Sequence, residues 1–210
     1  MKLLENLGAP AVLMFIGALI SAAGAIWASQ RQVISETELR HKSDEIAELN
    51  KQIAAAITGG DSFAYMVLTY LKNAENPRPV LLHQGEYPLY DLNVRIVDLA
   101  LLELGRQTHQ EYSISDMRRD EVRLVIGNLA PHESRLFDPV KLDGDVLRWN
   151  LFFNGRNGFF TESLRFRRVG NEWKTAVLVT KSDPTTGETT TLLEKVDPDY
   201  PRGKDGKVVW

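Results

Sequence analysis

The four histidines are the residues best suited to hold a transition metal or to move a proton near neutral pH. Their spacing matches no metal-binding motif, since neither His-Glu-x-x-His nor a similar pair is present; they are His41, His83, His109 and His132. His83 precedes the turn at Pro88, where we expect it to form a hydrogen bond at a strand end. The absence of cysteine excludes thiolate metal sites, thiol catalysis and disulfides. We therefore expect neither a metal site nor a bound cofactor.

Serine and carboxylate chemistry also lacks a motif in this sequence. Ser62 stands outside any Gly-x-Ser-x-Gly elbow. Asp91 and Asp98 are seven residues apart on one predicted strand, so they point to opposite faces and about 23 Å separates them. That separation excludes the carboxylate pair of a glycosidase. We predict no catalytic residue, and an envelope enzyme or small-ligand sensor with its site in the loops of the β domain is the alternative interpretation.

Two arginines are candidates for binding an anion. Arg165 and Arg167 share one face of a predicted strand, while Leu164 and Phe166 point to the other face, because side chains alternate along a strand. A polar face with two guanidinium groups can meet phosphates or an acidic partner. A solvated sheet face has the same pattern, so the sequence leaves both interpretations open.

A third candidate binding residue, Arg156, lies at the tip of a predicted hairpin. The tip is Asn154-Gly-Arg-Asn-Gly158, with two phenylalanines on each side. Asn-Gly pairs favour tight hairpin turns, and binding loops are found at the ends of β-sandwiches. The alternative is an ordinary tip whose phenylalanines belong partly to the core.

The positions of these side chains depend on the secondary structure that carries them. The longest predicted element is one helix from Pro10 to Ile57. Its first part has no charged residue and would measure about 28 Å, close to the roughly 30 Å hydrocarbon core of a bilayer. We predict a transmembrane helix over residues 10–29, after an N-terminal tail over residues 1–9. A cleaved signal peptide is the alternative, because Ala23-Gly24-Ala25 fits its cleavage pattern.

Residues 30–57 are predicted to continue this helix as a coiled-coil stalk. Apolar residues recur there at heptad spacing, at Leu39, Ile46, Leu49, Ile53 and Ala56. Small residues occupy the same seam within the membrane segment, where close backbone packing drives helix association. We therefore expect a parallel homodimer through the helix from Ala11 to Ala56. A lone amphipathic helix that packs on its own β domain is the alternative.

Residues 58–200 are predicted to form an all-β antiparallel sandwich. Gly59-Gly60 ends the helix, and eight or nine short apolar runs are separated by Gly, Pro and Asn turns. The predicted strands include Phe63 to Leu71, Leu89 to Leu99 and Thr189 to Val196, with one polar helical turn within Ser113 to Glu121. Residues 201–210 are predicted to be an irregular C-terminal tail.

The order of these features resembles Ig-like β-sandwich modules of bacterial envelope proteins, in which a turn such as Leu129 to Glu133 follows an alternating strand. The chain also resembles a group of uncharacterised bacterial single-pass membrane proteins. The shared segments are Thr-Gly-Gly-Asp-Ser (58–62), Tyr-Pro-Leu-Tyr-Asp (87–91) and Arg-Asn-Gly-Phe-Phe (156–160). This resemblance implies a membrane-anchored Ig-like sandwich and brings no activity with it.

The net charge of residues 58–210 limits the kinds of partner that they can bind. These residues contain 20 Lys and Arg against 22 Asp and Glu. This balance does not favour a specific nucleic acid. We expect membrane lipid around the helix and a protein partner on the sandwich, which makes the chain a membrane-anchored binding or scaffolding protein. A deep pocket with converging polar groups would favour a small ligand instead.

The membrane orientation follows from the basic residues that flank the predicted span. Arg31, Arg40 and Lys42 follow it and only Lys2 precedes it, so the positive-inside count predicts a cytoplasmic β domain in the cell membrane. A periplasmic β domain is the alternative.

Overall fold

The computed structural model describes residues 9–70, 76–108, 121–142 and 144–210. Residues 1–8 of the predicted N-terminal tail, His109, and residues 113–120 of the predicted helical turn lie outside the described residues. The chain divides into two compact units, residues 1–53 and residues 54–210.

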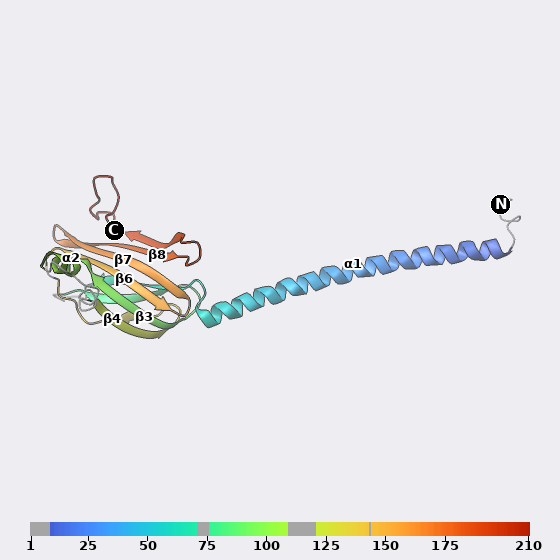
Figure 1. Cartoon of the computed structure of the whole chain (residues 1–210), viewed down its shortest axis with the longest axis horizontal. Coiled ribbons are helices and arrows are strands. Elements are labelled where there is room, and N and C mark those ends of the chain that lie inside the picture. Colours follow the sequence, from blue (N-terminus) through green and yellow to red (C-terminus); the bar gives the residue numbers. More distant parts are fainter. Residues whose placement is uncertain (1–8, 71–75, 109–120, 143) are drawn as a thin grey trace. The chain divides into compact units, whose positions relative to one another are not determined.

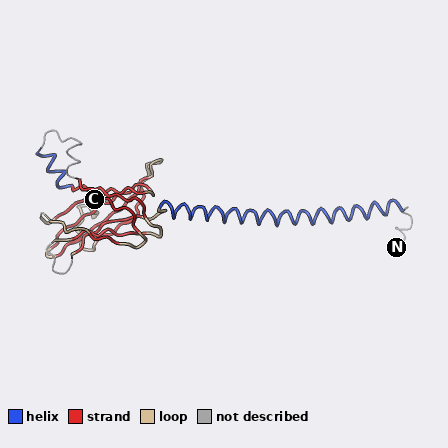
Figure 2. Tube along the Cα trace, turned by 90° about the horizontal axis from the view of Figure 1, so that it is seen from below, coloured by secondary structure: helices blue, strands red, loops and turns tan. Residues whose placement is uncertain are grey.

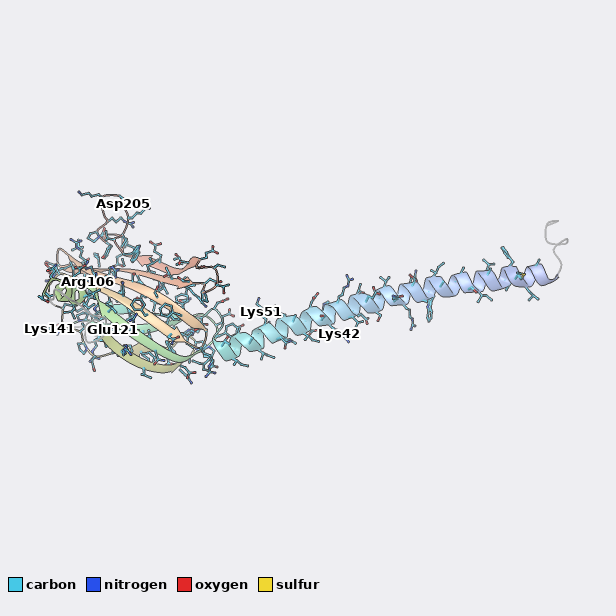
Figure 3. The ribbon with its side chains drawn as sticks, in the orientation of Figure 1. Lys42, Lys51, Arg106, Glu121, Lys141 and Asp205 are labelled. Carbon is cyan, nitrogen blue, oxygen red and sulfur yellow. The ribbon has the colours of Figure 1, made fainter. Side chains whose placement is uncertain are left out.

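The predicted long helix is α1, Ala9–Thr58, and it is continuous over 50 residues (Figure 1). It is long and apolar enough to cross a membrane. Its side chains from Leu13 to Ala54 are exposed, including the seam residues Ile46 and Leu49. Charged side chains such as Lys42 and Lys51 project from its C-terminal half (Figure 3).

Two glycines end α1, as the sequence predicts. Gly59 and Gly60 both have positive φ angles, 103° and 51°, and the Gly59 N–H donates to the Ala55 carbonyl at 2.8 Å. A side chain at Gly60 would also meet the Tyr87 ring at 2.7 Å. The left-handed backbone and the close approach of the ring therefore both require glycine.

The strands after α1, drawn in red in Figure 2, form two antiparallel sheets, as predicted. The three-stranded sheet has the order β1-β2-β5 and the six-stranded sheet has the order β4-β3-β6-β7-β8-β9. The first consists of β1 (Phe63–Thr69), β2 (Arg78–Gln84) and β5 (Ser134–Leu136). The second consists of β4 (Glu121–Leu129), β3 (Leu89–Asp98), β6 (Val146–Gly155), β7 (Gly158–Val169), β8 (Glu172–Ser182) and β9 (Thr189–Val196).

Apolar side chains from both sheets meet in one core. Period-2 alternation turns one face of each strand inward, which is clear in β6, where Leu147, Trp149, Leu151 and Phe153 are buried. Phe153 pairs across the hairpin with Phe160 on β7, and their rings stack with centroids 4.8 Å apart. We call this the inner face of the six-stranded sheet and the opposite one its outer face.

A second helix, α2 (Leu99–Thr108), follows β3 directly and was not predicted. Asp98 provides its N-terminal cap, because its Oδ1 accepts the Ala100 N–H at 2.8 Å. The apolar run from Leu99 to Leu102 continues the composition of β3, which conceals the change from strand to helix.

The C-terminal residues 201–210 have no regular secondary structure, yet they pack on the sheet. Val208 and Tyr200 are buried in a small cluster with Ala176, and Trp210 packs against it. This segment therefore forms part of the fold.

Candidate functional site

Arg156 lies in the two-residue turn of the β6–β7 hairpin, in which Gly155 pairs with Gly158. Asn157-Gly158 is not the centre of this turn: Gly158, with φ 111°, follows it. The Arg156 Nη2 forms a 2.7 Å ion pair with Asp91 Oδ2, and its guanidinium lies over the Tyr90 ring. Arg156 is half exposed, and its charge already has a partner within the chain.

Ser62 and His83 have structural partners. The Ser62 Oγ accepts the Tyr87 N–H at 2.9 Å, and the Asn157 amide donates to the Ser62 carbonyl. His83 Nε2 lies 2.8 Å from the Tyr87 carbonyl, and its Nδ1 accepts the His132 N–H, which confirms the predicted strand-end hydrogen bond. Burial lowers the pKa of His83, which favours the neutral ring.

Arg165 and Arg167 are on the outer face of β7, as the alternation predicts, but their surroundings differ. Arg167 is exposed, whereas Arg165 is 2% exposed. The Arg165 guanidinium donates to the Trp149 carbonyl at 2.8 Å, the Leu164 carbonyl at 3.1 Å and Asn150 Oδ1 at 3.0 Å. All three acceptors are uncharged, and the burial of Arg165 contradicts the interpretation of this face as a solvated one at that residue.

A cavity of about 550 Å³ lies beside Arg165, and we call it the arginine cavity. Four arginines line it: Arg148, Arg165, Arg167 and Arg202. The C-terminal segment contributes Tyr200 and Val209 to its wall. Burial lowers the pKa of Arg165 and the nearby charge of Arg148 lowers it further, against the opposite effect of Tyr200. The guanidinium still remains charged near neutral pH.

A second cavity of about 540 Å³ lies on the inner side of the six-stranded sheet, and we call it the apolar cavity. Its walls come from both sheets, with β1 and β2 on one side and β3, β4 and β6 on the other, and from α2 and the segment after β5. They include Ile96, Leu101, Leu124, Phe137, Leu142 and Leu147. Lys141 lies at the same end of the sandwich as α2 (Figure 3). This end is remote from Gly155, because β6 begins at the cavity with Val146 and ends at the hairpin turn.

A few polar groups accompany these apolar walls. The Trp149 Nε1–H donates to Asp98 Oδ2 at 3.1 Å, so Asp98 joins the cap of α2 to the cavity wall. Asp138 and Lys141 are exposed where they line the cavity. Asp91 and Asp98 are at opposite ends of β3, and each has its own partner.

The described residues contain no cluster of His, Asp and Glu that would hold a metal ion. Mostly apolar walls with a few oriented polar groups are typical of a binding pocket. Sequence reasoning missed this cavity because α2 and β6, which shape it, are about 50 residues apart in the chain. The one local signal was Asp98 before an apolar run, a typical helix start.

Comparisons of the chain with protein-family models, curated proteins and solved structures found no match.

Proposed function

We propose that the chain is a membrane-anchored binding protein whose β-sandwich takes a small apolar ligand in the apolar cavity. The observation that carries this proposal is the cavity itself. Its volume of about 540 Å³ lies within the roughly 300–1,000 Å³ of small-molecule sites. A cavity of this volume favours a small ligand over a protein partner on a flat patch. The paired antiparallel sheets support kinship with Ig-like modules at the level of architecture only.

Two valines of β4 make a matched pair for testing the ligand. Val122 is 55% exposed, lines the cavity and pairs with the inward-facing Ile96, whereas Val125 is 86% exposed, lies outside the cavity and pairs with Asn93. A Val122→Trp substitution puts a large ring at the cavity, while Val125→Trp on the same strand leaves the cavity open.

The experiment uses the full chain in lipid nanodiscs with a photoactivatable long-chain alcohol, and maps the crosslinked residues by mass spectrometry. We expect crosslinks at Leu124 and Phe137, several-fold fewer in Val122→Trp and unchanged in Val125→Trp. Crosslinks confined to the apolar part of α1, with none in the cavity wall, would contradict a ligand site in the sandwich.

The anchor is the second part of the proposal: α1 crosses the cell membrane once, with the sandwich on the cytoplasmic side. The apolar length of α1 supports a span. The basic residues that follow the span support the orientation. The chain has no cysteine, so Ser182→Cys, at an exposed position, gives one label site. Labelling by an impermeant maleimide, once the outer barrier is opened, would indicate a periplasmic sandwich.

We further propose that α1 pairs in parallel with a second copy through Ala11 to Ala56, as a coiled coil in the stalk. The exposure of Ile46, Leu49 and Ile53 supports this, because an apolar seam in water favours a partner. Ile46→Cys and Leu49→Cys should form disulfide dimers on oxidation more readily than Asn50→Cys. Equal crosslinking at the three positions would contradict the seam.

A further inference from the structure

We infer that the ligand is a single-chain amphiphile, with its hydrocarbon chain in the apolar cavity and an oxyanion head group at the arginine cavity. This inference rests on the proposed function and adds the chemical class of the ligand. Three observations carry it: the two cavities adjoin, only the arginine cavity is lined by arginines, and the cationic side chains around that cavity exceed the anionic ones.

The two cavities adjoin at the beginning of β6. Ala100 of α2 and Val146 of β6 line both of them, and both residues are exposed. The apolar cavity is on the inner face, with Leu147 and Trp149, and the arginine cavity is on the outer face, with Arg148 and Arg165. A molecule that passes over the end of β6 therefore reaches from one cavity to the other.

The lining side chains of the two cavities fit the two parts of an amphiphile, because aliphatic and aromatic residues dominate one lining and four arginines belong to the other. The apolar cavity removes a hydrocarbon chain from water, which is favourable in proportion to the apolar area buried. A head group at Val146 or Ala100 stays at the exposed rim of both cavities. The ligand then needs no polar atom deep between the sheets, where an unpaired polar group is costly.

The charges around the arginine cavity favour an anion. Arg148 pairs with Glu103 at 2.6 Å, and Arg202 donates to the Gly206 carbonyl. Arg165 has only uncharged acceptors, and Arg167 has no ion pair among the described residues. Two guanidinium groups on the same face of β7 thus lack a carboxylate within the described chain. Guanidinium forks bind carboxylate and phosphate oxygens in bidentate fashion.

Adjacent arginines on β7 make a matched pair of variants. Arg167 lines the arginine cavity and is exposed, so Arg167→Gln removes a charge from the proposed head-group site without opening the core. Arg168 points to the other face, over the Trp173 ring, and lines neither cavity. Arg168→Gln therefore removes the same charge from the same strand at a different place, together with the exposed 3.6 Å ion pair between Arg168 and Asp145.

The test uses the full chain in nanodiscs and two photoactivatable probes of the same chain length, a fatty acid at a pH where it is ionised and a fatty alcohol. The readout is crosslinking at Leu124, measured against probe concentration. We expect Arg167→Gln to weaken the binding of the fatty acid about tenfold, equivalent to about 1.4 kcal/mol, and to leave the binding of the fatty alcohol unchanged. Arg168→Gln should leave both unchanged, so partition of the probes into lipid cancels in these comparisons.

Other outcomes would overturn the inference in distinguishable ways. If both probes bind and Arg167→Gln changes neither, the ligand is apolar without an anionic head group and the proposed function stands. If Arg167→Gln weakens the binding of both probes equally, Arg167 stabilises the fold and does not bind the head group. If neither probe reaches Leu124, the proposed function fails as well. Inorganic phosphate at millimolar concentration should compete only weakly, and full competition would indicate a site for free phosphate.

Discussion

Each face of β7 buries one ionisable side chain, and the two side chains differ in their hydrogen-bond partners. Glu162 is on the inner face and Arg165 is on the outer face; they are 1% and 2% exposed. Neither forms an ion pair among the described residues. Glu162 Oε2 accepts the Met66 N–H at 2.8 Å, while its Oε1 has no partner. Arg165 donates three hydrogen bonds.

The difference follows from the chemistry of the two groups. Burial raises the pKa of the Glu162 carboxyl well above its ordinary value, so it becomes neutral by binding a proton. A guanidinium cannot lose its charge near neutral pH, and it therefore needs acceptors and a polar opening. Burial thus favours the neutral form of Glu162 on the inner face, whereas Arg165 keeps a fixed positive charge beside a cavity on the outer face. This contrast supports the proposed anion site on the outer face.

The largest effect should come from neighbouring phenylalanines on the two faces of β6. Phe153→Ala removes a fully buried ring that stacks on Phe160, and should cost about 3–5 kcal/mol of unfolding free energy. Phe152→Ala removes a partly exposed ring that stacks on the exposed Phe159, and should cost well under half of that. Denaturant unfolding of the full chain, followed by tryptophan fluorescence, measures both. Equal costs would show that the outer face is packed like the core.

Features set by local patterns could be predicted from the sequence. The last strand, Thr189–Val196, has the predicted bounds, because alternating Thr and Leu follow a clear turn. The end of α1 at Gly59-Gly60 and the shared face of Arg165 and Arg167 are equally local. Each depends on residues within one turn or one strand period.

Features set by distant contacts could not be predicted. The burial of Arg165 depends on the segment around Tyr200, which is 35 residues later in the chain and has no periodic pattern. The apolar cavity depends on α2, whose leucines read equally well as strand or helix. Both parts of the candidate site therefore come from packing between segments, and only Arg165 and Arg167 were identified in advance.

The second prediction concerns the pH dependence of stability, which the buried Glu162 carboxyl should cause and the Arg165 guanidinium should not. Because the pKa of Glu162 is higher in the folded than in the unfolded chain, the folded state binds more protons between the ordinary carboxyl value and the raised one. Stability should therefore fall as pH rises through that window, by up to about 1.4 kcal/mol per pH unit. Below the window, this contribution of Glu162 is fully present.

Glu162→Gln gives the reference, since the amide carries no proton equilibrium and its oxygen can still accept the Met66 N–H. The difference in unfolding free energy between the two proteins, measured from pH 4 upward, cancels the other titrating groups. We expect the unfolding free energy of the unsubstituted protein to fall relative to that of Glu162→Gln as pH rises. A difference that does not change with pH would mean that Glu162 is charged in the folded state, and the contrast with Arg165 would disappear.

The smallest effect should come from the exposed ion pair of Arg156 and Asp91, which sharpens the contrast between a buried and a solvated arginine. Both side chains are about half exposed or more, so water and salt screen their attraction. A double-mutant cycle with Arg156→Gln and Asp91→Asn should give a coupling energy of at most about 1 kcal/mol, which falls further as salt is added. Asp91 has a positive φ of 54°, a conformation that asparagine also tolerates, so Asp91→Asn leaves the backbone unstrained. A coupling well above this value would identify the hairpin tip as a rigid part of the fold. A coupling energy near zero would mean that Arg156 can leave Asp91 for an anionic ligand at little cost. The hairpin tip would then be a second candidate anion site beside the arginine cavity.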